Sequence, residues 1–259
     1  MSRLCFGTEP LAIKKGPDGR QTQGDKTPVQ GGEILAEASR LGVCMWDTSD
    51  DYGTHPHVRE ALKRVKRRSV VVADKSNAAT HEEGVNAVEF ALHDLGTEYI
   101  DIMFLHIVPP RPIQRKDAND RPYISQDLKG RKGALEAYME ARDSGRIKKI
   151  ALSTHSTDTL HQALEYPEID IVCAPLNKLG TYLDDGSQND RLNALKALHG
   201  SGKGVYVIKT LAAGRYREDA EACIRYALGF HDFIDAWNIG MYDLEDVKRN
   251  IALFSEALG

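Results

Sequence analysis

The feature that most constrains the fold is a regular alternation between short apolar segments rich in β-branched residues and amphipathic segments. This alternation is typical of a parallel sheet whose strands are joined by crossover helices. Eight strand–helix pairs fit the chain. The expected strands are 3–7, 43–47, 69–74, 100–106, 148–153, 169–174, 205–209 and 233–239. The expected helices are 32–41, 57–67, 82–95, 132–144, 157–164, 190–200, 217–230 and 244–258.

The expected helices have the pattern needed to cover a barrel. In the last one, Leu244, Val247, Ile251 and Phe254 recur at three- and four-residue steps, so one apolar stripe can pack on strands. Glycines such as Gly42 directly precede a strand, where a left-handed residue ends the helix. We therefore predict an α/β fold, a (β/α)8 TIM barrel. Residues 1–259 are expected to form it as a single domain, since barrels of roughly 250 residues commonly do so.

The composition argues against several classes of partner. There are 34 basic and 38 acidic residues spread along the chain, for a formal charge of -4, so no large basic face for nucleic acid is expected. No apolar run approaches the roughly 18 residues of a membrane span, and no secretory leader is expected. The four cysteines lie far apart and form no CxxC pair, which argues against a zinc site or a disulfide framework. These features predict a cytoplasmic protein outside the membrane.

Polar residues occur where three successive expected strands end. Asp47 ends the second strand and Tyr52 follows five residues later, Lys75 follows the third strand, and His106 ends the fourth. In a (β/α)8 barrel these ends open on one face, where active sites are built. Each residue also has an ordinary structural alternative: a loop cap, a rim aromatic, a surface cation and a core histidine. Their common rim favours a catalytic group.

These four side chains suit the reduction of a carbonyl group. A tyrosine with an ordinary pKa of about 10 is a slow proton donor at neutral pH, and a nearby ammonium favours its phenolate. We expect Lys75 to adjust the pKa of Tyr52 and Asp47 to keep Lys75 charged. His106 would donate a hydrogen bond to the substrate oxygen. A cofactor must supply the hydride, because no side chain can.

At these positions the sequence resembles the aldo-keto reductase family. The shared motifs are Phe6-Gly7-Thr8, Asp47-Thr48, Tyr52-Gly53, Lys75, Leu95-Gly96-Thr97-Glu98-Tyr99-Ile100-Asp101, Leu105-His106, Ser144-Gly145-Arg146-Ile147, Ser153-Thr154-His155, and Ile239-Gly240-Met241 with Glu245 and Asn250. The resemblance implies a (β/α)8 barrel with a tetrad of Asp47, Tyr52, Lys75 and His106, and NADPH or NADH as cofactor. The implied substrate is a small carbonyl compound or sugar, or an alcohol in the reverse direction.

The resemblance also implies where the cofactor binds. The corresponding residues are Gly7, Thr8, Asp47, Ser153, Thr154, Cys173, Ile208, Lys209, Gly240, Met241 and Asn250. Thr154 replaces the family's asparagine, Cys173 its glutamine and Ile208 its stacking aromatic. Gly240, Met241 and Asp246 replace the residues that grip the 2′-phosphate of NADPH. NADH, loosely bound NADPH and no cofactor all remain open.

The segments outside the expected helices and strands add further expectations. Segments 8–30 and 107–131 are long, and the second is a candidate lid over the barrel mouth. The chain ends at Gly259, directly after the last helix, so the family's C-terminal substrate loop is expected to be missing and the pocket open or completed by another subunit. His55 and His57 could bind a metal with a carboxylate, but no metal site is expected.

Two other functions fit parts of the pattern. The changed cofactor positions fit a nucleotide-sensing or regulatory barrel. The tetrad also fits a non-redox lyase or isomerase, with Tyr52 as base and Lys75 as electrophile. The oligomeric state stays open, and a homo-oligomer is one of the alternatives.

Overall fold

The computed structural model describes residues 2–15, 21–116 and 122–259 and contains a closed barrel of parallel strands. In chain order the barrel strands are β1 (Leu4–Gly7), β4 (Met45–Asp47), β5 (Val71–Ser76), β6 (Ile100–Leu105), β9 (Ile147–Ser153), β10 (Ile171–Pro175), β11 (Gly204–Ile208) and β12 (Ala236–Gly240). Each pairs with the next, and β12 pairs with β1. Because each of these strands overlaps one expected strand segment, the predicted (β/α)8 barrel is confirmed.

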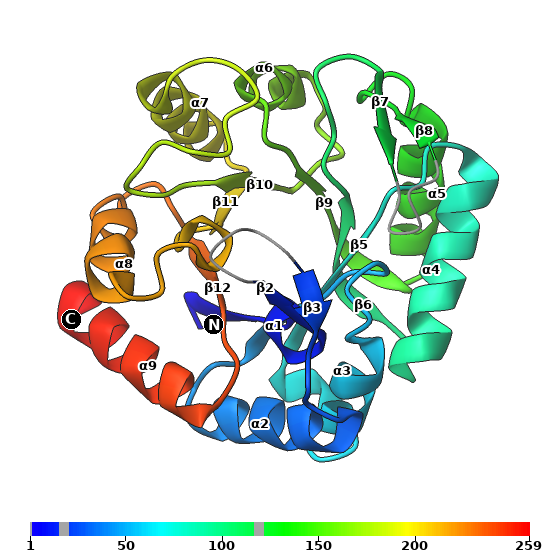
Figure 1. Ribbon diagram of the computed structural model, residues 1–259. Helices are drawn as coiled ribbons and strands as arrows, with labels where there is room; N and C mark the ends of the chain where they lie inside the picture. The colour runs from blue at the N-terminus through cyan, green and yellow to red at the C-terminus, as the bar shows by residue number, and fades with distance from the viewer. Residues whose placement is uncertain (1, 16–20, 117–121) are drawn as a thin grey trace.

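Helices surround the barrel (Figure 1). They are α2 (Pro28–Arg40), α3 (His55–Leu62), α4 (His81–Leu95), α5 (Lys132–Asp143), α6 (Thr157–Gln162), α7 (Gln188–Gly200), α8 (Ala220–Leu228) and α9 (Leu244–Leu258). Thr27, Thr80 and Ser187 form capping boxes that satisfy backbone N–H groups at the starts of α2, α4 and α7. Gly42, with a φ of 100°, ends its helix as expected. Among the described helices, none is both long and apolar enough to cross a membrane.

The basic segment after α3 differs from the expectation. We expected a helix to residue 67, but α3 ends at Leu62 and Arg67 begins a 3-10 turn, Arg67–Ser69. The Arg67 guanidinium donates to Asp101 Oδ2 at 2.7 Å and to the carbonyl of Tyr99 at 2.8 Å. This cation therefore ties the chain to the start of β6 instead of extending the helix. Other 3-10 turns are Ala163–Glu165, after α6, and Ala212–Gly214, before α8.

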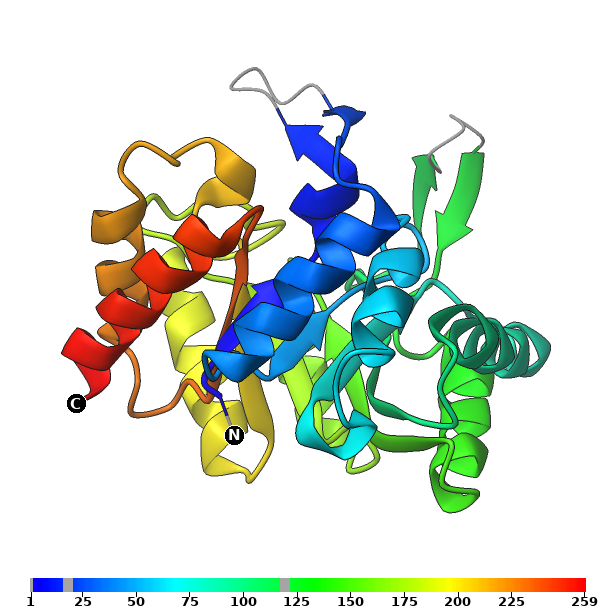
Figure 2. The same cartoon turned by 90° about the horizontal axis from the view of Figure 1, so that it is seen from below.

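Both long segments contain elements that we did not predict. The first holds a short helix, α1 (Glu9–Ala12), and a hairpin of β2 (Ile13–Lys15) and β3 (Gln21–Gln23). The second holds a hairpin of β7 (Ile113–Lys116) and β8 (Pro122–Ser125). Figure 2 shows both hairpins on the side of the barrel opposite the N-terminus. They therefore flank the face on which the strands end.

Side chains alternate between the barrel interior and the helix layer. On β5, Val72 packs in the outer core with the helices, whereas Ala73 lies in the smaller inner cluster. Two residues further on, Lys75 also points inward, while Asp74 bonds His55 of α3. The inner cluster consists of Cys5, Met45, Ala73, Ile102, Phe104, Ala151, Cys173, Tyr206 and Ala236. It forms a packed floor below the barrel mouth.

Candidate active site

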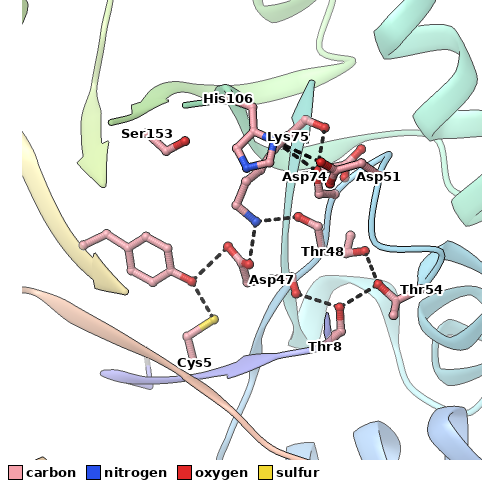
Figure 3. A network of polar contacts seen from close by, with 12 residues as sticks. Cys5, Thr8, Asp47, Thr48, Asp51, Thr54, Asp74, Lys75, His106 and Ser153 are labelled. Atoms are coloured by element: carbon pink, nitrogen blue, oxygen red, sulfur yellow. Dashed lines mark hydrogen bonds and ion pairs between the residues drawn. The ribbon is translucent and has the colours of Figure 1, made fainter. Parts of the chain in front are cut away.

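The four residues expected at the strand ends lie together at the barrel mouth. Asp47 is the last residue of β4, Lys75 lies one residue before the end of β5, and His106 directly follows β6. Figure 3 shows the side chains of these three turned toward one another. Tyr52 lies in the loop between β4 and α3, with its ring centroid 6.2 Å from that of His106. One small region thus holds two cation-forming groups, a carboxylate and a phenol.

Lys75 and Asp47 form a buried ion pair. Lys75 Nζ lies 2.5 Å from Asp47 Oδ1 and donates to the carbonyl of Thr48 at 2.6 Å. Both side chains are 1% exposed. Burial alone would lower the pKa of Lys75, but the charge of Asp47 and the hydrogen bond to it outweigh this effect and hold the pKa above its ordinary value. Lys75 is therefore charged at neutral pH.

Tyr52 lies beside this charge without a hydrogen bond to it. Lys75 Nζ is 4.8 Å from the centroid of the Tyr52 ring. Burial raises the pKa of Tyr52, and the opposing effect of Lys75 is smaller. The expected influence of Lys75 is present, but the phenol keeps its proton in this state and can act as a donor.

His106 is a neutral imidazole. Burial lowers its pKa, and so do the nearby charges of Lys75, Lys209 and Arg131. Its Nδ1 lies 3.4 Å from Ser49 Oγ and 3.9 Å from Asp51 Oδ2. A neutral imidazole can present one nitrogen to these groups and the other to a ligand.

A residue that we did not single out from the sequence completes the network. Tyr206, on β11, is buried, and its hydroxyl donates to Asp47 Oδ2 and to Cys5 Sγ, both at 3.0 Å. Asp47 therefore binds Lys75 through one oxygen and Tyr206 through the other. One signal could have found Tyr206: its neighbours Val205 and Val207 face the outer core, so a polar group faces inward and needs a partner there.

Two sets of residues bear on metal binding. Asp50, Asp51 and His106 place one ligand atom each within 4.8 Å of one another, and both carboxylates are exposed. His55 and His57 do not form a shared site: His55 bonds two carboxylates, whereas His57 bonds a loop carbonyl. The metal site considered for these two histidines is therefore not supported.

Several expected cofactor residues are buried and already occupied within the protein. The Thr8 hydroxyl donates to the carbonyl of Asp47 at 2.8 Å, and that of Thr154 donates to the carbonyl of Val108 at 2.6 Å. Ser153 Oγ accepts from the N–H of Ile107 at 2.8 Å. Cys173 belongs to the inner cluster and Met241 to the outer core. In this structure the hydroxyls of Thr8 and Thr154 thus form hydrogen bonds at the barrel rim, and the side chains of Cys173 and Met241 pack in the two cores.

Other expected cofactor residues remain accessible or unsatisfied. Ile208 and Lys209, at the end of β11, are partly exposed, and Gly240, at the end of β12, is exposed. Asn250, on α9, is buried, and neither atom of its amide has a hydrogen-bond partner among the described residues. Buried amides normally have partners, so Asn250 fits a polar ligand. These residues could hold a dinucleotide.

The start of α9 is acidic. Asp243 accepts hydrogen bonds from the N–H groups of Glu245 and Asp246 at 3.0 and 2.9 Å. Asp246 accepts from the N–H of Tyr242 at 3.0 Å and pairs with Arg249 at 2.6 Å. These carboxylates thus accept hydrogen bonds from backbone N–H groups that, at the start of other helices, can bind a phosphate. Side chains of the protein itself therefore accept hydrogen bonds from these N–H groups at the start of α9.

Comparison with known proteins decides the family. Residues 3–228 match the family model described as the Aldo/keto reductase family. The chain belongs to this family. The NADH-specific methylglyoxal reductase of Escherichia coli is 26% identical over 219 residues, which are 74% of this chain and 59% of that protein. The NAD(P)H-dependent D-xylose reductase of Kluyveromyces lactis is 26% identical over 142 residues, 47% of this chain and 43% of that protein.

The chain spans about half the length of these curated relatives. Solved structures of the family show the same fold over nearly the whole chain. A Pseudomonas aeruginosa protein assigned to the aldo-keto reductases has a TM-score of 0.72 at 20% identity, covering 100% of this chain and 91% of that one. The Bombyx mori aldo-keto reductase in complex with NADP has a TM-score of 0.70 at 16% identity, covering 98% and 84%.

Proposed function

We propose that this member of the aldo/keto reductase family reduces the carbonyl group of a small aldehyde, ketone or sugar, with NADH or NADPH as hydride donor. The observation that carries the proposal is the meeting of a protonated Tyr52, a charged Lys75 and a neutral His106 at the mouth. The printed activities of two relatives, a methylglyoxal reductase and a D-xylose reductase, support it.

Tyr52 and His106 have different roles toward the carbonyl oxygen. The oxygen binds between the Tyr52 hydroxyl and His106 Nε2. Ser49 Oγ lies 3.4 Å from Nδ1; in the proposed arrangement this hydroxyl donates to Nδ1, which leaves the imidazole proton on Nε2, where it orients the carbonyl. As negative charge develops on the oxygen, Tyr52 transfers its proton. Lys75, held by Asp47, stabilises the phenolate that remains.

Ile208, Lys209, Gly240 and Asn250 would hold the cofactor, which supplies the hydride when bound. The start of α9 favours NADH over NADPH, because Asp243 already accepts hydrogen bonds from the N–H groups of Glu245 and Asp246 that a 2′-phosphate could otherwise bind. NADH preference is therefore part of the proposal.

The test compares wild type with Tyr52→Phe. Turnover is followed at the nicotinamide absorbance band with a panel of aldehydes, ketones and sugars. We expect the variant to lose at least about 100-fold in turnover, because proton transfer by a positioned acid contributes that much. Its affinity for NADH should stay the same, since Tyr52 is not among the cofactor residues.

Other outcomes would favour the alternatives. Nucleotide binding without turnover of any carbonyl would indicate a nucleotide-sensing barrel. A reaction that needs no nucleotide would indicate a lyase or isomerase. Unchanged turnover in Tyr52→Phe would remove Tyr52 as the acid.

A reducing compartment such as the cytoplasm fits this function. All four cysteines are free, and Cys5, Cys173 and Cys223 are buried. Unpaired thiols are typical of proteins that work where glutathione keeps them reduced.

A further inference from the structure

Charge is distributed unevenly around the barrel mouth. Glu9 and Asp51 lie on the side of Tyr52, where their charges raise its pKa after the larger effect of burial. Basic residues come from four other places: β7, the start of α5, the loop after β9 and the end of β11. They are Arg115, Arg131, His155 and Lys209. We name these four residues the basic wall.

The β7–β8 hairpin carries Arg115 on its less exposed face. Along β7, Ile113 and Arg115 are partly buried, whereas Gln114 and Lys116 are exposed. The hairpin register places Arg115 opposite Tyr123. Because alternate residues share a face, Arg115 lies on the side of the hairpin that is turned away from solvent.

Arg131 forms hydrogen bonds at the base of the same hairpin. Its side chain is fully buried. Nη2 donates to Ser125 Oγ at 3.2 Å and Nε donates to the carbonyl of Gln126 at 2.9 Å. Ser125 pairs with Ile113, two residues before Arg115 on that face. Two guanidinium groups thus lie on the same side of the hairpin.

The basic wall has buried nitrogen atoms without partners. Arg115 Nε, Arg131 Nη1 and His155 Nε2 have no hydrogen-bond partner among the described residues. Buried guanidinium groups are normally paired because desolvation is costly, and a buried nitrogen of a neutral imidazole such as that of His155 normally has a hydrogen-bond partner as well. A ligand that brings negative charge would satisfy these groups.

The basic wall and the catalytic histidine are close enough to affect each other. Burial lowers the pKa of His155 to about 3, with further lowering by Lys209, Arg191 and Arg115. Arg131 and Lys209 act in the same direction on His106. The positive potential of the basic wall therefore extends to the position proposed for the carbonyl oxygen.

We propose that the basic wall binds an anionic group of the carbonyl substrate, a carboxylate or a phosphate, and that Arg115 makes the contact. Arg115 is partly exposed, so its guanidinium can reach a ligand and bind it through two parallel hydrogen bonds. Arg131 stays buried behind it and adds charge. The inference rests on the proposed function and narrows the substrate to oxo acids or phosphorylated carbonyl compounds.

The test uses two aldehydes of equal chain length, succinic semialdehyde with a carboxylate and butanal without one. Arg115→Gln should raise the KM for succinic semialdehyde about 10- to 100-fold, as expected for losing hydrogen bonds to a charged group. The KM for butanal and both kcat values should stay the same. Arg115→Lys keeps the charge but not the paired donors, so its KM for succinic semialdehyde should lie between those of wild type and Arg115→Gln. Lys116→Gln makes the same change of charge on the exposed face of the hairpin. It is the matched control, and its KM and kcat values should equal those of wild type.

Binding measurements without turnover separate the anion from the reaction and from the cofactor. Titration calorimetry should show succinate binding to wild type more tightly than to Arg115→Gln, with equal NADH affinity. Weaker NADH binding in Arg115→Gln, with both KM values unchanged, would assign the basic wall to the cofactor diphosphate and overturn the proposal. The proposal would also be overturned if succinic semialdehyde and butanal had equal KM values, both in wild type and in Arg115→Gln. The proposed carbonyl reduction would still stand in that case. If no aldehyde is reduced but succinate binding still depends on Arg115, the proposed function fails and the anion site remains.

Discussion

At the scale of single residues, the site depends on how Asp47 is held. Lys75 binds one of its oxygens at 2.5 Å and Tyr206 the other at 3.0 Å. A buried carboxylate needs such donors to stay ionised and fixed in place. Tyr206 thus positions Asp47, and through it the ammonium beside Tyr52.

The variant Tyr206→Phe tests this positioning role. It removes one donor and keeps the ring, which packs against Phe104 at 6.0 Å between centroids. We expect the free energy of unfolding to fall by about 1–3 kcal/mol, because Asp47 Oδ2 loses its tyrosine donor in a buried site. Turnover should fall several-fold with little change in KM. Urea denaturation and steady-state kinetics measure both effects.

Tyr138→Phe is the matched control. Tyr138 is equally buried, but its hydroxyl, which lies near Ser76, makes no well-aligned hydrogen bond among the described residues. Its stability should change by less than about 0.5 kcal/mol, with full activity. Equal losses in the two variants would mean that the bond to Asp47 has no special role.

Position along the chain was enough to locate some site residues and not others. Asp47, Lys75 and His106 could be predicted because each lies at a strand end, and strand ends share one rim. Tyr206 could not be assigned a partner, because β12 and β1 separate its strand from that of Asp47. The hydrogen bond from the Thr154 hydroxyl to the carbonyl of Val108 could not be predicted either, because the sequence does not show which loops lie side by side.

At the scale of elements, one histidine joins α3 to β5 and α4. His55 is 3% exposed, with Nε2 3.0 Å from Asp74 Oδ1 and Nδ1 3.1 Å from Asp94 Oδ2. Burial alone would lower the pKa of His55, but the two carboxylates outweigh it and raise the pKa above its ordinary value. The protonated ring is therefore the form that stabilises this contact.

The stability supplied by His55 should depend on pH. Its folded-state pKa lies above the unfolded value of about 6.5. The contribution is therefore complete below about pH 6.5 and is lost as pH rises through the folded pKa. In urea denaturation, His55→Asn should cost more stability at about pH 6 than at about pH 9. His81→Asn, at an exposed histidine, should show a small and nearly constant effect; equal losses for His55→Asn at both pH values would contradict a charged His55.

The elements of the barrel were easier to predict than the additions to it. Alternating apolar and amphipathic segments locate the eight strands and their helices, because burial on both sides of a strand leaves a clear pattern. The β7–β8 hairpin stands apart from the barrel sheet and has exposed, polar residues such as Gln114 and Lys116, so its pattern is weak. The early start of α2 had a visible signal, Thr27 before Pro28 with Gln30 three residues on, which forms the capping box.

At the scale of the whole molecule, the barrel closes where the first and last strands pair. β1 and β12 bring Gly7 opposite Gly240. A Cβ atom on Gly7 would overlap Asn238 Oδ1 and lie 3.2 Å from Gly240 Cα. Gly7, expected from the family resemblance to contact the cofactor, therefore has a packing role at this seam.

Gly7→Ala should damage the fold and the site together. Overpacking at the seam is expected to lower the free energy of unfolding by about 1–3 kcal/mol. Turnover should fall as well, because the displaced Asn238 side chain lies close enough to Asp47 to lower the pKa of its carboxyl. Gly200→Ala, at the end of α7 with open space around the added Cβ, should be neutral or more stable by up to about 1 kcal/mol. Urea denaturation and steady-state kinetics of both variants provide the measurement. If Gly7→Ala is as stable as wild type, β1 and β12 can move apart at no cost in stability. In that case barrel closure does not hold Asn238 near Asp47.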